Sequence, residues 1–268
     1  MKLIPLFLLT GMLAVSGWAE DAKPEHYSPD LVKRAEAGDA KAQYDLGACY
    51  YSGKGVTQDY KKPVKWNMKS TQQRNAIGQH YLGACQYEGK GVTQDYKKAV
   101  KWWTKAAEQG YAKGQHSLGW CYYSGYGVAQ DYKEAVKWYT KSAEQGDVRG
   151  QCNVGFSYYN GYGVTQDYKE AVKWYTKSAE QGDADSQFSL GWSYYNGFGV
   201  AQDYKEAVKW YTKSAEQGDA VAQSCLGTCY YEGKGANQDY KEAVKWWTKA
   251  AEQAGIEAKN KLEKLKSK

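Results

Sequence analysis

The sequence predicts an all-α solenoid made of six helix-turn-helix repeats, and three observations predict it. A glycine, the tetrapeptide QDYK and a tryptophan each recur six times, always at intervals of 36 residues. The glycines are Gly47, Gly83, Gly119, Gly155, Gly191 and Gly227, and the tryptophans are Trp66, Trp102, Trp138, Trp174, Trp210 and Trp246. Stacked repeats need contacts only with their neighbours, so a fixed period of this length is typical of a solenoid.

Each repeat is predicted to hold two helices, and the third repeat shows why. Its first helix is expected over 113–123 and ends at the turn SGYG, where glycines supply the freedom that a tight turn needs. Its second helix is expected over 131–145, because Asp131 is a good N-cap and Glu134 completes a capping-box pattern. Gly146 is predicted to end that helix in the left-handed conformation.

The ends of the array differ from its middle, as a solenoid requires. Ser28 and Pro29 are suited to begin a helix and Gly38 to end one, which predicts an N-terminal capping helix within the segment 20–38. The six repeats are assigned to 39–255. The lysine-rich segment 256–268 is predicted to close the other end as a polar capping helix.

The first repeat departs most from the others. Pro63 stands near the start of its second helix, where the other repeats have alanine, and Arg74 replaces the glycine that ends that helix. Proline removes a backbone donor and crowds the first turn. We therefore expect the junction between the first and second repeats to be the least stable part of the array.

Residues 1–19 are predicted to be a signal peptide that is cleaved after Ala19. Lys2 precedes an apolar run, and small residues stand at the cleavage site. The run is shorter than the ~20 apolar residues that cross a bilayer. No later segment is apolar enough to span a membrane, so we predict a periplasmic or secreted protein without membrane insertion.

The charge of the chain argues against a nucleic-acid partner. The formal net charge is +6, and the lysines are interspersed with glutamates. Nucleic-acid binding usually needs a concentrated basic face, and export would remove the target.

The repeats carry a family resemblance. The segments AQYDLGACYYSGKGVTQDYKKPVKW and AQSCLGTCYYEGKGANQDYKEAVKWWTKAAEQ resemble the Sel1-like repeat (SLR) family, a relative of the tetratricopeptide repeats. The resemblance covers 39–253, with departures such as Gln86 in place of tyrosine. It implies a right-handed α/α superhelix and an adaptor or scaffold role, because members are not generally enzymes. It implies no particular partner, since function lies in the site and not in the fold.

Comparison of the repeats with one another shows which positions change. On a helical wheel, the face of the first helix around the recurring glycine is nearly constant, which predicts that this face packs. Two variable columns lie four residues apart on another face. In the central three repeats one column reads Trp120, Phe156 and Trp192, and the other reads His116, Cys152 and Phe188. We predict a partner-binding groove there. Its residues are a ladder of Trp120, Phe156 and Trp192, the flanking His116 and Phe188, and the rim residues Tyr126, Tyr162 and Phe198.

Two interpretations of these columns stay open. Large exposed apolar patches usually mark an interface, which favours a groove. The other interpretation is drift on a tolerant surface, or packing between neighbouring first helices. The outer repeats carry Lys54, Lys90 and Lys234 where the central repeats carry the rim aromatics.

The sequence predicts no catalytic residue, no metal site and no cofactor. His80 with Cys85, and His116 with Cys121, fall about 140° apart on the wheel, whereas a structural zinc needs four converging ligands. No hydrolase nucleophile motif occurs. All six cysteines lie on first helices. Cys49, Cys85 and Cys121 share one column, and we predict that they are small buried residues where helices approach closely.

These observations together predict a monomeric, non-enzymatic scaffold that binds a partner protein or peptide in the concave groove. Aromatic anchors commonly dominate such interfaces. A carbohydrate or cell-wall binding module is the first alternative, because stacked aromatic rings also suit sugar rings. A hydrolase acting on cell-wall-related or lactam substrates is the second.

Overall fold

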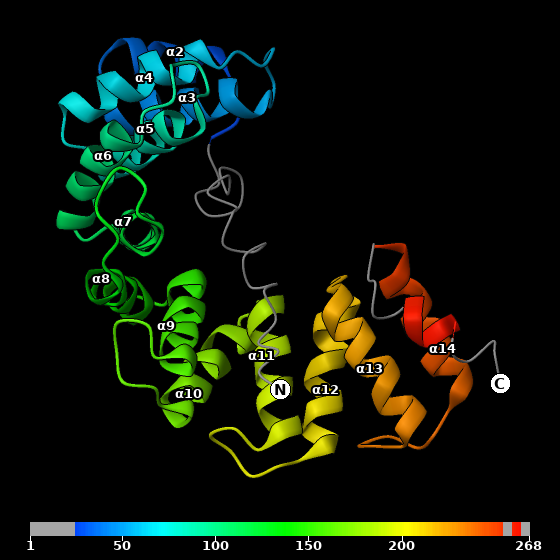
Figure 1. Ribbon diagram of the computed structural model, residues 1–268. Helices are drawn as coiled ribbons and strands as arrows, with labels where there is room; N and C mark the ends of the chain where they lie inside the picture. Colours follow the sequence, from blue (N-terminus) through cyan, green and yellow to red (C-terminus); the bar gives the residue numbers. More distant parts are fainter. Residues whose placement is uncertain (1–24, 254–258, 264–268) are drawn as a thin grey trace. The chain divides into compact units, whose positions relative to one another are not determined.

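The computed structural model describes residues 25–253 and 259–263, in which all regular structure is helical (Figure 1). A capping helix, α2 (Pro29–Glu36), precedes six helix pairs. The pairs are α3 (Ala40–Ser52) with α4 (Lys61–Gln72), α5 (Ala76–Glu88) with α6 (Tyr96–Glu108), α7 (Ala112–Ser124) with α8 (Tyr132–Glu144), α9 (Val148–Asn160) with α10 (Tyr168–Glu180), α11 (Ala184–Asn196) with α12 (Tyr204–Glu216), and α13 (Ala220–Glu232) with α14 (Tyr240–Glu252). The all-α solenoid prediction is confirmed.

Two predicted segments fall wholly or partly outside the described residues. The predicted signal peptide, 1–19, lies outside them. Of the predicted C-terminal cap, 259–263 are helical, and the remainder lies outside the described residues. None of the described helices is both long and apolar enough to cross a membrane.

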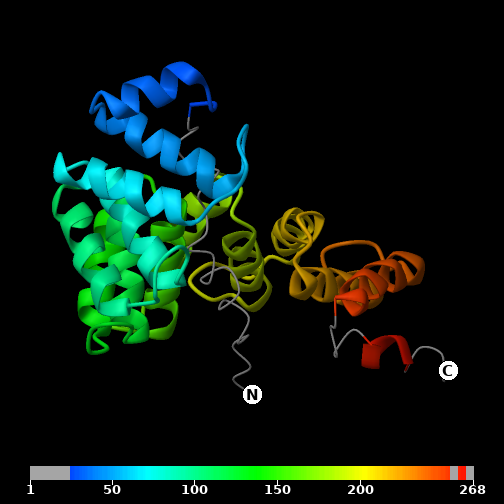
Figure 2. The ribbon, with the colours of Figure 1, turned by 90° about the horizontal axis from the view of Figure 1, so that it is seen from above.

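The chain divides into two compact units, and each is described by itself. The N-terminal unit ends at Asp147 and contains repeats 1 to 3, and the C-terminal unit begins at Val148 and contains repeats 4 to 6. Within a unit, the two helices of a pair lie side by side (Figure 1 and Figure 2), and each second helix also packs against the next first helix. Within each unit the main helix–helix contacts therefore join consecutive helices, as expected for a solenoid.

The predicted helix ends are confirmed. In α8, Asp131 Oδ1 accepts hydrogen bonds from the N–H groups of Lys133 (2.9 Å) and Glu134 (3.1 Å), and Gly146 follows the helix with a φ of +88°. At α2, Ser28 Oγ accepts from the N–H of Leu31 at 3.1 Å. These caps satisfy helix-end donors that have no partner within the helix.

The recurring glycine marks the place where the two helices of a pair cross. A Cβ atom built on Gly119 would lie 2.7 Å from Cδ1 of Tyr139, and one on Gly83 would lie 2.6 Å from Cδ1 of Trp103. No side chain fits in that space. The ring of the second helix therefore lies directly on the backbone of the first.

Repeat 1 keeps the fold in spite of its departures. α4 begins at Lys61, so Pro63 falls in the first turn, where a missing N–H leaves no helical hydrogen bond unmade. Arg74 takes the place of the stop glycine with a φ of +58°, a conformation that costs a residue with a Cβ roughly 1–2 kcal/mol. The predicted low stability of this junction stays a prediction.

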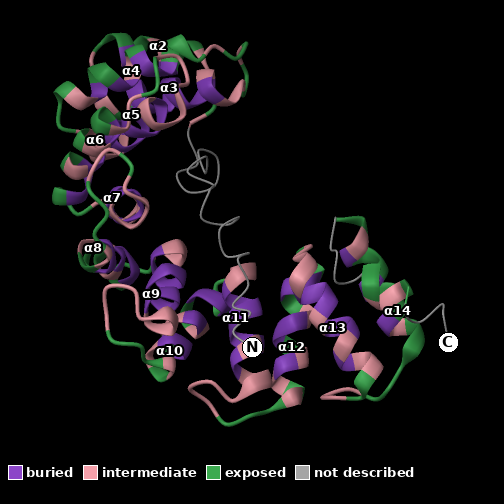
Figure 3. Ribbon diagram, in the orientation of Figure 1, coloured by how far each residue is buried: buried purple, intermediate pink, exposed green. Residues whose placement is uncertain are grey.

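The first helices are buried on more than the predicted packing face (Figure 3). Gln43, Leu46 and Gly47 pack as predicted, but Tyr44 and Ala48, on the variable face, are buried as well. At these two positions burial favours packing between neighbouring helices, which is one of the interpretations that the sequence left open. The next repeat covers them, and a wheel drawn for one helix does not include that neighbour.

Candidate partner-binding site

The eight predicted site residues are divided between the two compact units. The N-terminal unit holds His116, Trp120 and Tyr126, and the C-terminal unit holds Phe156, Tyr162, Phe188, Trp192 and Phe198. Three of them are buried, with exposed fractions of 4% for Trp120, 8% for Phe156 and 6% for Phe188. Tyr126 is exposed, and the other four are half-buried. Burial favours the packing interpretation for the three buried rings, and a partner could contact only the other five directly.

In the N-terminal unit, aromatic residues of repeat 3 hold a tyrosine of repeat 2. Trp120 Nε1 donates a hydrogen bond of 3.1 Å to the hydroxyl of Tyr87. The ring of Tyr126 stacks on Tyr96 with 4.9 Å between centroids, and it meets Tyr87 edge to face at 5.8 Å. These residues form one aromatic seam between consecutive repeats.

The C-terminal unit repeats this arrangement. Trp192 Nε1 of repeat 5 donates to the hydroxyl of Tyr159 of repeat 4, again at 3.1 Å. Phe198 stacks on Tyr168 at 5.1 Å and meets Tyr159 edge to face at 6.2 Å. The second aromatic seam therefore uses the same positions as the first.

Elsewhere in each unit, a different set of residues holds the corresponding tyrosine of the preceding repeat. Between repeats 1 and 2, the hydroxyl of Tyr51 donates to Glu88 Oε2 at 2.8 Å and accepts from Lys90 Nζ. Lys90 and Glu88 also form an ion pair of 2.9 Å. We call this arrangement a charged seam.

The charged seam also recurs, between repeats 5 and 6. Lys234 Nζ lies 2.9 Å from Glu232 Oε2 and 3.3 Å from the hydroxyl of Tyr195. Side-chain hydrogen bonds to Glu232 and Tyr195 raise the pKa of Lys234. Aromatic and charged seams are thus two ways to hold the same tyrosine of the preceding repeat.

Comparison of the repeats in sequence predicts the rim columns but not the seams. The rim lysines and aromatics are evident there, whereas their contacts with the tyrosine that stands in every repeat, and with Glu88 and Glu232, appear only in the structure. A signal was available: glutamate precedes the turn in two repeats only, as Glu88 and Glu232, and both repeats also have a small ladder residue and a rim lysine. Repeat 1 has Ala48 and Lys54 but no glutamate there.

The other variable column is also used in packing. The rings of Tyr44 and Tyr81 stack at 4.9 Å, and His80 Nε2 lies 3.2 Å from Ser117 Oγ in the next repeat. In the C-terminal unit, Phe188 stacks on Tyr211 at 5.8 Å. These contacts support packing as the role of the buried members of this column.

The cysteines behave as the sequence predicts. All six are thiols, and Cys49, Cys85, Cys121 and Cys229 are buried at the predicted close approach of helices. Burial raises the pKa of Cys85, Cys121 and Cys229 to about 12, so these thiols stay protonated at neutral pH, and the thiolate is the reactive form. Within 25–253 and 259–263, no group of three or more His, Cys, Asp or Glu side chains is placed to hold a metal ion.

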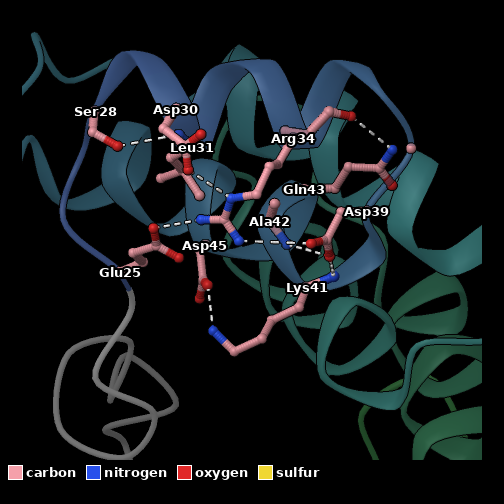
Figure 4. Close-up of polar contacts among 12 residues, drawn as sticks. Glu25, Ser28, Asp30, Leu31, Arg34, Asp39, Lys41, Ala42, Gln43 and Asp45 are labelled. Atoms are coloured by element: carbon pink, nitrogen blue, oxygen red, sulfur yellow. Dashed lines mark hydrogen bonds and ion pairs between the residues drawn. The ribbon is translucent and has the colours of Figure 1, made fainter.

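A charged cluster closes the N-terminal end of the array (Figure 4). Arg34 contacts three carboxylates, namely Glu25, Asp30 at 2.9 Å and Asp39 at 3.6 Å. Lys41 pairs with the buried Asp45 at 2.6 Å, and burial raises the pKa of Asp45. The ion pairs of Arg34 are partly exposed, so each contributes little to the stability of the fold. Through Arg34 they connect α2 with Glu25 in the preceding segment and with Asp39, the N-cap of α3.

The segments of the chain that match a known family recur with the same period. The Sel1 repeat family model matches residues 40–66, 76–111, 112–147, 148–183, 184–219 and 220–254. The chain belongs to the Sel1 repeat family. Sel1 repeats commonly mediate protein–protein interactions, and proteins built from them are generally non-enzymatic scaffolds. No match is found among curated proteins.

Solved structures of Sel1 repeat proteins resemble the chain closely. A protective antigen of uropathogenic Escherichia coli strains that displays an SLR fold is 41% identical, with a TM-score of 0.78, over 84% of this chain and 48% of the antigen. The chain thus spans about half the length of that antigen. A Sel1 repeat protein from Oxalobacter formigenes is 32% identical, with a TM-score of 0.73, over 83% of this chain and 87% of that protein.

Proposed function

We propose that this Sel1 repeat protein is a non-enzymatic scaffold of the bacterial periplasm, or a secreted one, that binds a partner protein or peptide. The contact residues are the accessible aromatic side chains of the central repeats, with Tyr126, Tyr162, Trp192 and Phe198 as the principal ones. Two buried rings pack against them, Phe156 on Tyr162 and Phe188 on Trp192.

The observation that carries this proposal is the pair of seam types. A charged seam holds the tyrosine of the preceding repeat without any additional aromatic residue. Stacking of the repeats therefore does not require tryptophan at 120 or 192, or an aromatic residue at 126 or 198. Aromatic side chains in excess of what stacking needs, and partly exposed, are typical of binding surfaces.

The test converts aromatic seams into charged ones. W120A/S124E/Y126K gives repeat 3 the seam residues of repeat 2, and W192T/N196E/F198K gives repeat 5 those of repeat 6. Both conversions keep a partner for the tyrosine hydroxyl, so helicity should stay close to that of the parent. The reverse conversion, A84W/E88S/K90Y, is the matched control.

The conversions are compared with the parent, residues 20–268, by crosslinked capture from periplasmic extract. The captured protein is then purified and its affinity is measured for every variant. We expect both conversions to weaken binding at least tenfold and the control to leave it unchanged. Equal affinity for parent and conversions would place the interface on other residues.

The half-buried indole of Trp192 also suits a carbohydrate ring, which keeps a cell-wall binding module as the second candidate. Titration with soluble cell-wall fragments separates the two candidates. A change in tryptophan fluorescence that is absent from W192T/N196E/F198K would favour the carbohydrate module.

A further inference from the structure

The outer faces of α4 and α6 carry a concentration of lysine that the later second helices lack. The two helices together contain eight lysines and one glutamate, whereas α8, α10, α12 and α14 each contain three lysines and two glutamates. We call this surface the lysine face. Its lysines, all exposed, are Lys61, Lys62, Lys65, Lys69, Lys97, Lys98, Lys101 and Lys105.

The lysine face arises from one replaced position in each helix. In α8, Glu134 pairs with Lys137 at 3.0 Å, and the same pair recurs in α10, α12 and α14. Lys62 and Lys98 stand at the position of that glutamate. As a result, no carboxylate oxygen of the described residues lies within 4.0 Å of Lys65 Nζ or Lys101 Nζ, the counterparts of Lys137.

The acidic groups near this face neutralise little of it. Asp95 pairs with Lys98 at 3.2 Å, Asp59 stands before the first turn of α4, and Glu108 lies at the far end of α6. Glu88, on the neighbouring α5, is already paired with Lys90. Most of the positive charge on α4 and α6 therefore faces solvent.

Both helices lie on the same side of the first helices in the N-terminal unit. α4 packs on α3 and α5, and α6 packs on α5 and α7, so the outer face of each helix points away from these first helices. Trp66 and Trp102 are half-buried between the lysines, with Lys69 and Lys105 over their rings at 4.6 and 4.7 Å. Met68 is 52% exposed.

We propose that the lysine face binds the surface of an anionic phospholipid bilayer, with no helix inserted. The charge is spread over two helices that both pack on α5, and a charge spread in this way suits an extended array of anionic headgroups. Lysines near an anionic leaflet contribute additively, and tryptophan favours the membrane interface. The side chains exposed on these helices include the eight lysines and Met68, with Trp66 and Trp102 half-buried between them.

The proposal is tested by co-sedimentation of residues 20–268 with lipid vesicles. One preparation is phosphatidylcholine alone, and the other contains about one third phosphatidylglycerol, a composition in which attraction of basic residues is strong. We expect binding to the anionic vesicles only, and we expect added salt to weaken it, because salt screens surface charge. Absence of binding to anionic vesicles at low salt would overturn the proposal.

Two charge variants locate the contact. K62E/K98E restores the glutamates found in the later repeats and supplies ion-pair partners for Lys65 and Lys101. The loss of two lysines alone should weaken vesicle binding about 30-fold. K169E/K205E makes the same change in net charge on the exposed lysines of α10 and α12, and it should leave binding within about twofold of the parent.

Two further outcomes would contradict the assignment. Equal loss of binding in K62E/K98E and K169E/K205E would show that net charge, not this face, determines adsorption. Binding to an acidic polypeptide or to nucleic acid that is lost in K62E/K98E, together with no binding to anionic vesicles, would assign the lysine face to that polymer instead. Circular dichroism of each variant verifies that the fold is retained.

Discussion

Repeats 1 and 3, both in the N-terminal unit, share one backbone arrangement but hold it with different side chains. Where the helices of repeat 3 cross, Gly119 lies against the ring of Tyr139. In repeat 1, Gly47 faces Asn67, which is fully buried and whose amide makes no hydrogen bond among the described residues. Repeat 3 stops its second helix with Gly146, and repeat 1 does so with Arg74. The stack thus tolerates a repeat that has lost its own optimal contacts, because the neighbouring repeats still hold it.

The largest difference in stability between equivalent variants of repeats 1 and 3 should appear at the glycine where the two helices of a repeat cross. G119A would place a Cβ against the Tyr139 ring, and overpacking of this kind costs about 1–3 kcal/mol. G47A meets only the Asn67 side chain, 3.1 Å away, and the gain of roughly 1 kcal/mol in helix propensity should offset that contact. Urea unfolding of both variants measures the contrast. A G47A variant as unstable as G119A would show that the two crossings are equally tight.

The buried amide of repeat 1 offers a stabilising change. N67L removes two polar groups that lack partners, and an unsatisfied buried polar group costs about 1–3 kcal/mol. We expect a higher Tm by thermal unfolding. N67D, which keeps the shape and adds a buried charge, should lower Tm and serves as the control. No gain from N67L would indicate that water satisfies the amide in solution.

Substitution of the residue that ends the second helix should change the free energy of unfolding by a smaller amount. R74G relieves a left-handed conformation and should stabilise the protein by roughly 1 kcal/mol. The reciprocal G146R should destabilise it by a similar amount. Both changes are measured from the midpoints of denaturant unfolding, with the slope m expected to stay unchanged. If R74G were neutral, contacts of the arginine side chain would have to compensate the backbone cost.

Substitution of Asp45 should give the smallest change in stability, and that change should depend on pH. It stands where repeat 3 has Ser117, and burial raises its pKa above 3.8, while Lys41 opposes that shift. The folded state therefore binds the proton more tightly than the unfolded state. This contribution to stability is full below about pH 3.8 and is lost as the pH rises through the raised pKa.

D45S should remove that contribution. As the pH increases from about 4, the Tm of the parent should fall relative to the Tm of D45S. Subtraction of the variant cancels the opposite contribution of Asp39, whose pKa is lowered by backbone hydrogen bonds from Ala42 and Lys41 and by Arg34. A pH-independent difference would show that Lys41 fully compensates the burial of Asp45.

Much of the fold was predictable because local signals recur at a fixed period. Asp131 and Gly146 set the ends of α8, and Gly119 set the crossing, through chemistry contained in a few residues. Burial of Tyr44 and Ala48 was not predictable from one helix, since the next repeat covers them. The seams were missed for the same reason: Trp120 meets Tyr87 only after the repeats have stacked.

Of the candidate site, the sequence predicted which positions differ, and the structure gave their surroundings. Trp120, Phe156 and Phe188 proved buried, whereas Tyr126 proved exposed. Trp120 and Phe156 share one column, Phe188 lies in the other, and Tyr126 lies in the turn after α7. The sequence of one repeat did not show which of these side chains the neighbouring helices cover. Their role toward a partner stays a prediction.

The seam tyrosine stands in all six repeats, at 51, 87, 123, 159, 195 and 231, and in the seams described here it accepts either type of follower. This has a genetic consequence. Unequal crossing-over between the near-identical repeat coding segments inserts or deletes whole multiples of 36 residues. Because the tyrosine accommodates a tryptophan or a glutamate–lysine follower, a newly adjacent pair can form a seam without further mutation when its second repeat derives from repeat 2, 3, 5 or 6. At such junctions the array can change length and keep the seam.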